Sequence, residues 1–132
     1  MEVYRYKAVG FKSTGPIADN FKALDFYEEL NISGDIINAG KAISMKTTKV
    51  TDVNIWRNYN SVKNNIQHLK DGFQGGITWN GKTIKYTTPE IHIYMPKDKF
   101  TQSIANSWKN TLESLHPQIK FEISTLEKFI KN

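Results

Sequence analysis

The dipeptide Asn80-Gly81 is the feature that most constrains the fold of this chain. It separates residues 77–79 from residues 83–86, and both segments are rich in β-branched and aromatic side chains. An Asn-Gly pair readily supplies the two positive φ angles of a type I′ turn, whose twist matches that of paired antiparallel strands. We therefore predict a β-hairpin at this point, and the fold must contain a sheet.

Four more strands are predicted from short runs of β-branched and aromatic residues. They cover residues 2–9, 41–46, 90–95 and 119–123. In residues 90–95 the apolar Ile91 and Ile93 alternate with polar neighbours, so one face of this strand is expected in the core and the other in solvent.

Three helices are predicted from apolar residues that recur every three or four positions. The first follows Asp19 and reaches Leu30, the second starts at Thr51 or Asp52 and ends near Gly72, and the third follows Pro96. Residues 31–40 are predicted to be a polar loop and residues 126–130 a helical turn. The side chains expected in the core from the last two helices are Trp56, Val62, Ile66, Phe100, Ile104, Trp108 and Leu112. Together these elements predict one α+β domain over residues 1–132, with a mixed, mostly antiparallel sheet of short strands.

Composition narrows the classes of function. The chain has no cysteine, which excludes disulfides, a thiolate nucleophile and a zinc–thiolate site. It has no run of eighteen apolar residues and no charged-then-apolar leader, so we expect no signal peptide and no membrane contact. We also expect a monomer that acts in the cytoplasm. A net charge of +5 suits nucleic acid, an anionic nucleotide or an acidic partner. The alternative explanation for this charge is an AT-rich genome that encodes many lysines, which are scattered along the sequence and are ordinary solvated side chains.

A sparse set of polar residues lies in or beside three predicted strands: Arg5, Ser44 with Thr47, and Glu90. Arg5 is flanked by Tyr4 and Tyr6, and a planar guanidinium suits bidentate recognition of phosphate or carboxylate. We expect the three segments to be neighbouring strands, with the ends of Arg5, Ser44 and Glu90 opening on a common cleft.

This order of Arg, Ser/Thr and Glu resembles the R-S-E class of mono-ADP-ribosyltransferase toxin domains, found at the C-termini of bacterial polymorphic and contact-dependent inhibition toxins. The resemblance spans about the first hundred residues and rests on residues 3–6, 42–48 and 89–100. It implies an ADP-ribosyltransferase-like fold and NAD as substrate, with Arg5, Ser44 and Glu90 catalytic. In this family Arg5, Ser44, Thr47 and Tyr86 would bind NAD, and Glu90 would stabilise the oxocarbenium-like transition state. The family usually has Glu or Gln where this chain has Thr88, which leaves the acceptor residue open.

Two other classes of function fit the same sequence. In a barnase- or colicin-like toxin ribonuclease, His92 beside Glu90 would move protons, with Thr47, Lys85 and Arg57 as further candidates. In a non-enzymatic inhibitor, of the immunity or phage anti-defence type, none of these residues would be catalytic, and each would be an ordinary strand or surface residue. A toxin implies a macromolecular target, protein or RNA, and a cognate immunity protein. The histidines are 24 residues apart, which gives no local metal signature, so no metal is predicted.

Overall fold

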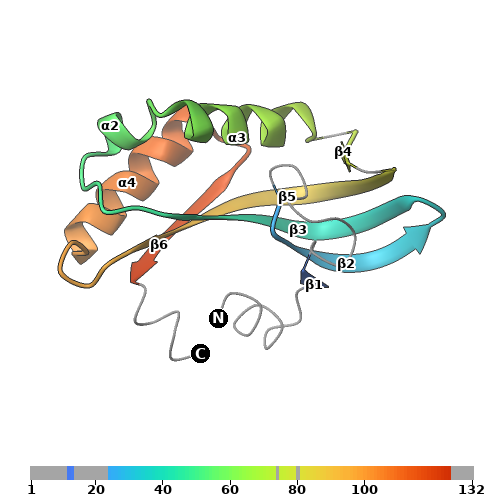
Figure 1. The fold of residues 1–132 in the computed structure, drawn as a ribbon, viewed down its shortest axis with the longest axis horizontal. Helices are drawn as coiled ribbons and strands as arrows, with labels where there is room; N and C mark the ends of the chain where they lie inside the picture. The colour runs from blue at the N-terminus through green and yellow to red at the C-terminus, as the bar shows by residue number, and fades with distance from the viewer. Residues whose placement is uncertain (1–11, 14–23, 74, 80, 126–132) are drawn as a thin grey trace.

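The computed structural model describes residues 12–13, 24–73, 75–79 and 81–125 (Figure 1). The elements follow the order β1 (Lys12–Ser13), β2 (Phe26–Ser33), β3 (Ile36–Thr47), α2 (Val53–Trp56), α3 (Asn60–Asp71), β4 (Ile77–Trp79), β5 (Lys82–Met95), α4 (Gln102–Leu115) and β6 (Lys120–Thr125). In these residues no helix is both long and apolar enough to cross a bilayer.

The described strands form one mixed sheet in the order β1-β2-β3-β5-β4, and β6 pairs with the later half of β5. The long strands β3 and β5 run parallel to each other, as do β5 and β6, while the remaining pairs are antiparallel. The helices all lie on one face of this sheet (Figure 1). The predicted α+β class with a mixed sheet is confirmed.

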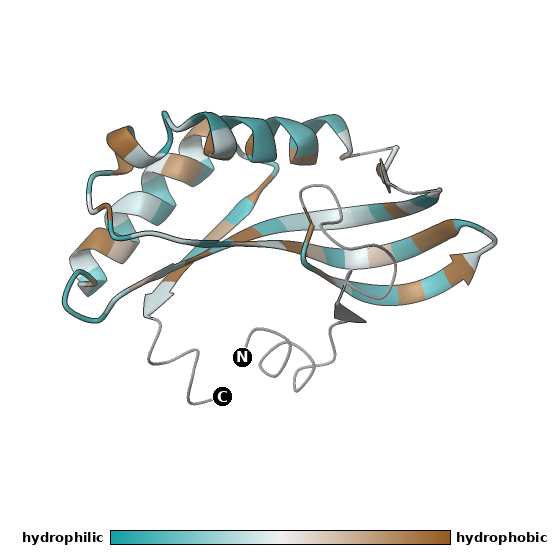
Figure 2. Cartoon of the chain, viewed as in Figure 1, coloured by the Kyte–Doolittle hydropathy of each residue, from teal (hydrophilic) through white to brown (hydrophobic). Residues whose placement is uncertain are grey.

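The main core lies between the helices and the sheet. Trp56 and Trp108 meet there with ring centroids 5.4 Å apart, and the Trp108 indole N–H donates to the Thr51 carbonyl. Figure 2 shows hydrophilic and hydrophobic residues side by side on α3 and α4, as expected for helices that bury one face. Of the predicted core residues, Trp56, Val62, Ile66, Trp108 and Leu112 are buried, and Phe100 and Ile104 are partly buried against the core.

The predicted hairpin is confirmed. Trp79 pairs with Lys82 across the turn, Ile77 pairs with Ile84, and Gly81 has the positive φ of +81° that its position requires. Of the two predicted starts of the second helix, Thr51 and Asp52, the structure has Asp52 as the N-cap, because its carboxylate accepts the Asn54 backbone N–H at 2.8 Å.

The prediction for residues 19–40 is wrong where the structure describes them. The later part of the expected first helix, from Phe26 onward, belongs to strand β2, and the expected loop 31–40 is the hairpin that joins β2 to β3 at Gly34, where φ is +60°. Apolar spacing in a short segment fits both a helix and a strand. Phe26 and Tyr27 pack into separate clusters on the two faces of the sheet, an arrangement that only a strand provides.

The second predicted helix is interrupted, and two predicted strands are joined. Residues 57–59 separate α2 from α3, and β5 continues through Pro89 from the hairpin to Met95. The glycine-rich turn after α3 is shaped by close packing, since a Cβ on Gly76 would lie 2.8 Å from the Ile84 carbonyl oxygen.

Candidate functional site

The structure separates two of the predicted site residues. Ile43 is the Cα partner of Glu90 in the parallel β3–β5 ladder, so Ser44, the next residue, faces the other side of the sheet. Ser44 is buried on the helix face, where its hydroxyl donates to the Asn65 side chain of α3 at 2.7 Å. The expectation that Ser44 and Glu90 open on a common cleft is therefore wrong. Arg5 lies outside the described residues.

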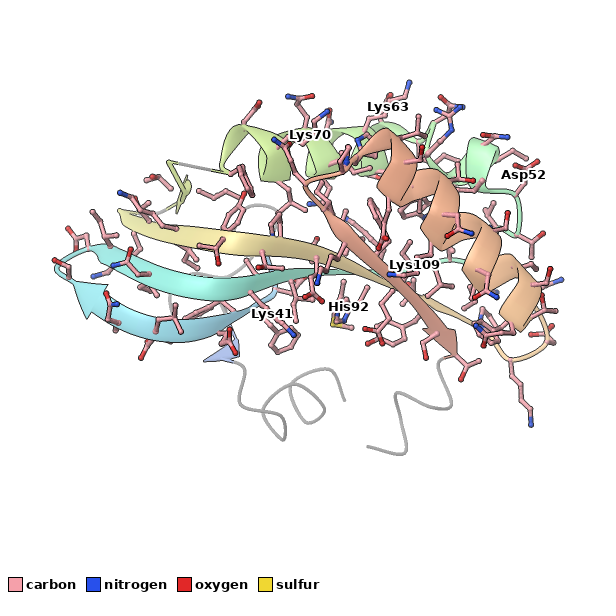
Figure 3. The ribbon with its side chains drawn as sticks, turned by 180° about the vertical axis from the view of Figure 1, so that it is seen from behind. Lys41, Asp52, Lys63, Lys70, His92 and Lys109 are labelled. Atoms are coloured by element: carbon pink, nitrogen blue, oxygen red, sulfur yellow. The ribbon has the colours of Figure 1, made fainter. Side chains whose placement is uncertain are left out.

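Glu90 and His92 form a close pair on the face of the sheet away from the helices, where Figure 3 shows His92 and Lys41. His92 Nε2 lies 2.9 Å from Glu90 Oε1, as expected from their two-residue spacing on one strand. The expectation that this face of the strand is solvent-exposed is wrong, since His92 is 6% exposed and Glu90 is 9% exposed. Burial on both faces is typical of a strand inside a parallel ladder.

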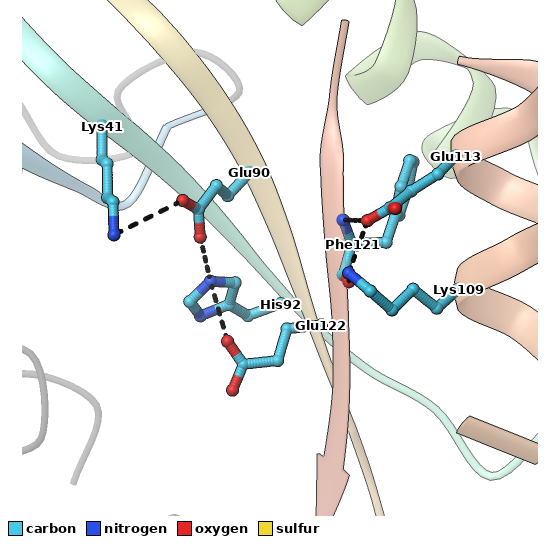
Figure 4. A network of polar contacts seen from close by, with 7 residues as sticks. All are labelled: Lys41, Glu90, His92, Lys109, Glu113, Phe121 and Glu122. Carbon is cyan, nitrogen blue, oxygen red and sulfur yellow. Dashed lines mark hydrogen bonds and ion pairs between the residues drawn. The ribbon is translucent and has the colours of Figure 1, made fainter. Parts of the chain in front are cut away.

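Three more charged residues reach this pair from neighbouring strands (Figure 4). Glu122 of β6 is the Cα partner of His92, and its Oε2 atom lies 3.6 Å from His92 Nε2. Lys41 of β3 places its Nζ atom 3.9 Å from Glu90 Oε2, and Lys120 of β6 is the Cα partner of Glu90. We call Glu90, His92 and Glu122 the polar trio.

The electrostatics of Glu90 are set by opposing effects. Burial alone would raise the pKa of its carboxyl group. The hydrogen bond and charge of His92, together with the charges of Lys41 and Lys120, outweigh burial and lower this pKa below its usual value. Glu90 is therefore held as a carboxylate although it is almost covered.

The polar trio adjoins a cleft beside β6. The cleft has a volume of about 240 Å³ and is lined by Glu90, Lys120 and Glu122 from the sheet and by Gln102, Asn106 and Lys109 from α4. Its lining carries both acidic and basic groups, which suits a polar or ionic ligand. The donor atoms of the trio also lie within 4.8 Å of one another, close enough to act on one bound atom.

The other predicted site residues are scattered. Thr47 is on β3, two residues beyond Met45, the Cα partner of His92, so it shares the face of His92. Tyr86 is buried, and its hydroxyl donates to the Leu69 carbonyl of α3, so it supports the core. Lys85 precedes His92 by about 23 Å along β5. Arg57 lies beside α2, where it donates to Asn54.

A second group of polar residues lies near Ser44. The Asp25 carboxylate accepts the backbone N–H of Met45 at 2.7 Å, and burial raises its pKa despite this bond and the charge of Lys46. Burial lowers the pKa of Lys46, while Asp25 opposes this effect. Lys46 alternates with Met45 along β3 and so shares the face of Ser44. Partial burial therefore disfavours both charges, and their mutual attraction opposes this effect.

Sequence reasoning missed Glu122, Lys41, Lys120 and the Asp25–Lys46 pair. The alternation Lys120, Glu122 in the last predicted strand showed that the two side chains share a face, but nothing in the sequence indicated that β6 lies beside β5. Parallel neighbours are set by crossover connections, which local patterns do not reveal.

Comparison with known proteins gives a fold and no family. No protein-family model matches the chain, and no curated protein matches it. The structure is similar to a chain of the CdiA-CT/CdiI toxin and immunity complex from Yersinia pseudotuberculosis, with a TM-score of 0.51 and 18% sequence identity. The match covers 83% of this chain and 86% of that chain. At this identity the likeness establishes a shared fold.

Proposed function

We propose that this chain is a toxin domain that cleaves phosphodiester bonds of nucleic acid at the polar trio. The observation that supports this most is the buried contact between Glu90 and His92, beside a cleft that is bordered by lysines. Glu90, His92 and Glu122 supply lone pairs that can activate an attacking hydroxyl or water. Lys41 and Lys120 supply positive charge for the phosphate, which becomes more negative in the transition state.

The structural neighbour supports a toxin or an immunity protein as the broad class of this chain. Its complex contains a toxin and an immunity protein, and either kind of chain is compatible with a shared fold. The net charge of +5 favours the toxin, because a basic protein suits a nucleic acid target, whereas inhibitors of basic toxins tend to be acidic. A toxin of this kind requires a cognate immunity protein as partner.

The ADP-ribosyltransferase hypothesis ranks second. Glu90 lines a polar cleft, as that chemistry requires. The family arrangement also needs the Ser/Thr strand to shape the same pocket, and Ser44 is directed to the opposite face. Transfer of ADP-ribose from NAD is therefore the alternative that the same experiment must test.

The experiment incubates the purified chain separately with total RNA, with duplex DNA and with NAD. We expect cut nucleic acid and no released nicotinamide, and Glu90→Gln should lower the cleavage rate by about 10²–10³ because charge at the reacting centre is lost. Asp98→Asn is the matched control, since it neutralises an exposed carboxylate outside the trio and should keep full activity.

The variants also report which face of the sheet is active. Loss of cleavage in Lys46→Met with normal cleavage in Glu90→Gln would move the activity to the Asp25–Lys46 face. Release of nicotinamide from NAD would reject the nuclease function in favour of the ADP-ribosyltransferase function. If none of the three substrates reacts, and both Glu90→Gln and Lys46→Met keep the effect of the wild type on cells, the chain acts as a binding protein.

A further inference from the structure

We propose that the polar trio binds a divalent first-row metal ion, Zn²⁺ or Mn²⁺, through Glu90 Oε1, His92 Nε2 and Glu122 Oε2. The inference rests on the proposed nuclease function for its role, and on geometry alone for the site itself. Imidazole nitrogen favours Zn²⁺, and carboxylate oxygen is shared by Zn²⁺ and Mn²⁺.

The distances fit a single ion. His92 Nε2 lies 2.9 Å from the Glu90 oxygen and 3.6 Å from the Glu122 oxygen, and all three donor atoms fall within 4.8 Å. Ligands bound to one ion at about 2.0–2.2 Å lie roughly 3–4 Å apart, so small side-chain rotations bring the trio into a coordinating position. His92 Nε2 donates a hydrogen bond to Glu90, so an ion would bind between the imidazole and the two carboxylates in exchange for this proton.

The surroundings supply what a metal site needs besides its ligands. Glu90 and His92 are held by parallel strands at the centre of the sheet, so their positions are fixed by the backbone. Lys41 contacts the second oxygen of Glu90, which orients the carboxylate with Oε1 toward His92. Glu122 is 51% exposed and lines the cleft, which provides an entry path.

The two lysines indicate what the ion is for. Lys41 and Lys120 reduce the affinity of the site for a free cation, but they would attract a phosphate that is bound to the same cation. A metal-bound water is more acidic than bulk water. After it loses a proton to solvent, its oxygen bonds to phosphorus, the P–O ester bond breaks, and the leaving sugar oxygen takes up a proton.

The test is calorimetric titration of the full chain with ZnCl₂ and, separately, MnCl₂. We expect one ion per chain and an affinity at least about tenfold lower in Glu122→Gln, which removes an exposed ligand at little risk to the fold. The bound ion should raise the melting temperature of the wild type, while Glu122→Gln shows a smaller rise. Asp98→Asn removes an exposed carboxylate between β5 and α4 and should bind like the wild type.

The outcome separates the metal site from the nuclease function. No binding of either ion, or equal binding by wild type and Glu122→Gln, overturns the site. Ion binding without cleavage of nucleic acid keeps the site and rejects the nuclease. Cleavage that persists in EDTA, together with an absence of ion binding, keeps the nuclease and rejects the metal.

Discussion

At the scale of single residues, the sequence suggests a catalytic role for the Ser44 hydroxyl, whereas its contacts in the structure show a structural role. Its strand position fits a catalytic motif, yet Ser44 is 2% exposed and its hydroxyl is hydrogen-bonded to the Asn65 side chain. A buried polar group that loses its partner costs more free energy than the hydrogen bond contributes on balance. The first role of Ser44 is therefore to join β3 to α3.

Ser44→Ala tests this role. It leaves the Asn65 side-chain oxygen without the Ser44 donor, and we expect the free energy of unfolding to fall by about 1–3 kcal/mol. Denaturant titration of the variant measures this change. Thr47→Ala, three residues further along β3 and exposed, should change stability by no more than about 0.5 kcal/mol. Full stability in Ser44→Ala combined with loss of activity would instead assign Ser44 to the active site.

At the scale of elements, the outer edge of β6 is closed by side chains of α4. The Phe121 N–H donates to Glu113 Oε2 at 3.0 Å, and Lys109 Nζ donates to the Phe121 carbonyl at 3.1 Å and to the same Glu113 oxygen at 2.7 Å (Figure 4). Free backbone groups on an edge strand invite pairing with other chains. The Lys109–Glu113 pair occupies both groups of Phe121 and fixes α4 to the sheet.

The pH dependence of Glu113→Gln tests this contact. Burial acts to raise the pKa of Glu113, but hydrogen bonds from Lys109 and Phe121 and the charges of Lys109 and Lys120 outweigh it and lower the pKa. Because the pKa of Glu113 in the folded state is lower than its usual value of 4.5, the ionised carboxylate stabilises the fold above about pH 4.5. This stabilisation is lost as the pH falls through the lower pKa of the folded state. Glu113→Gln should thus melt at a lower temperature than the wild type at pH 7, with a difference that shrinks below pH 4.5. An equal difference at pH 3 would contradict the ion pair.

At the scale of the whole molecule, the sheet separates two polar groups. The helices cover one face, on which Ser44 and Lys46 lie, and the polar trio lies on the other with Lys41 and Lys120 beside it. Two positive side chains, Lys41 and Lys120, therefore lie where an anionic substrate at the trio would contact them. Binding through lysine–phosphate contacts releases counterions, which makes the affinity depend on salt.

The salt dependence of nucleic acid binding should report these contacts. In a Glu90→Gln background, which limits cleavage, the affinity should fall linearly on a log–log plot against salt. Lys41→Gln or Lys120→Gln should reduce the slope by about one. Lys82→Gln is the control, because Lys82 pairs with Asp35 at 2.9 Å beside the hairpin turns. Equal slopes in all variants would place the nucleic acid elsewhere.

The sequence by itself determined the features that depend on neighbouring residues. The Asn80-Gly81 hairpin, the Asp52 cap, the apolar faces of the last two helices and the contact of Glu90 with His92 all follow from local spacing and backbone preferences. Where the local pattern fitted two structures, as in residues 26–30, pairing with β3 decided for the strand.

Only the tertiary structure decided which distant residues meet. Glu122 reaches His92 because β6 lies parallel to β5, and Ser44 is kept from Glu90 because a shift of one residue along a ladder moves a side chain to the other face of the sheet. Crossover connections and register depend on the packing of the whole chain and leave no mark on the local sequence. The candidate site is therefore a property of the sheet, assembled from residues whose types are visible in the sequence and whose proximity is not.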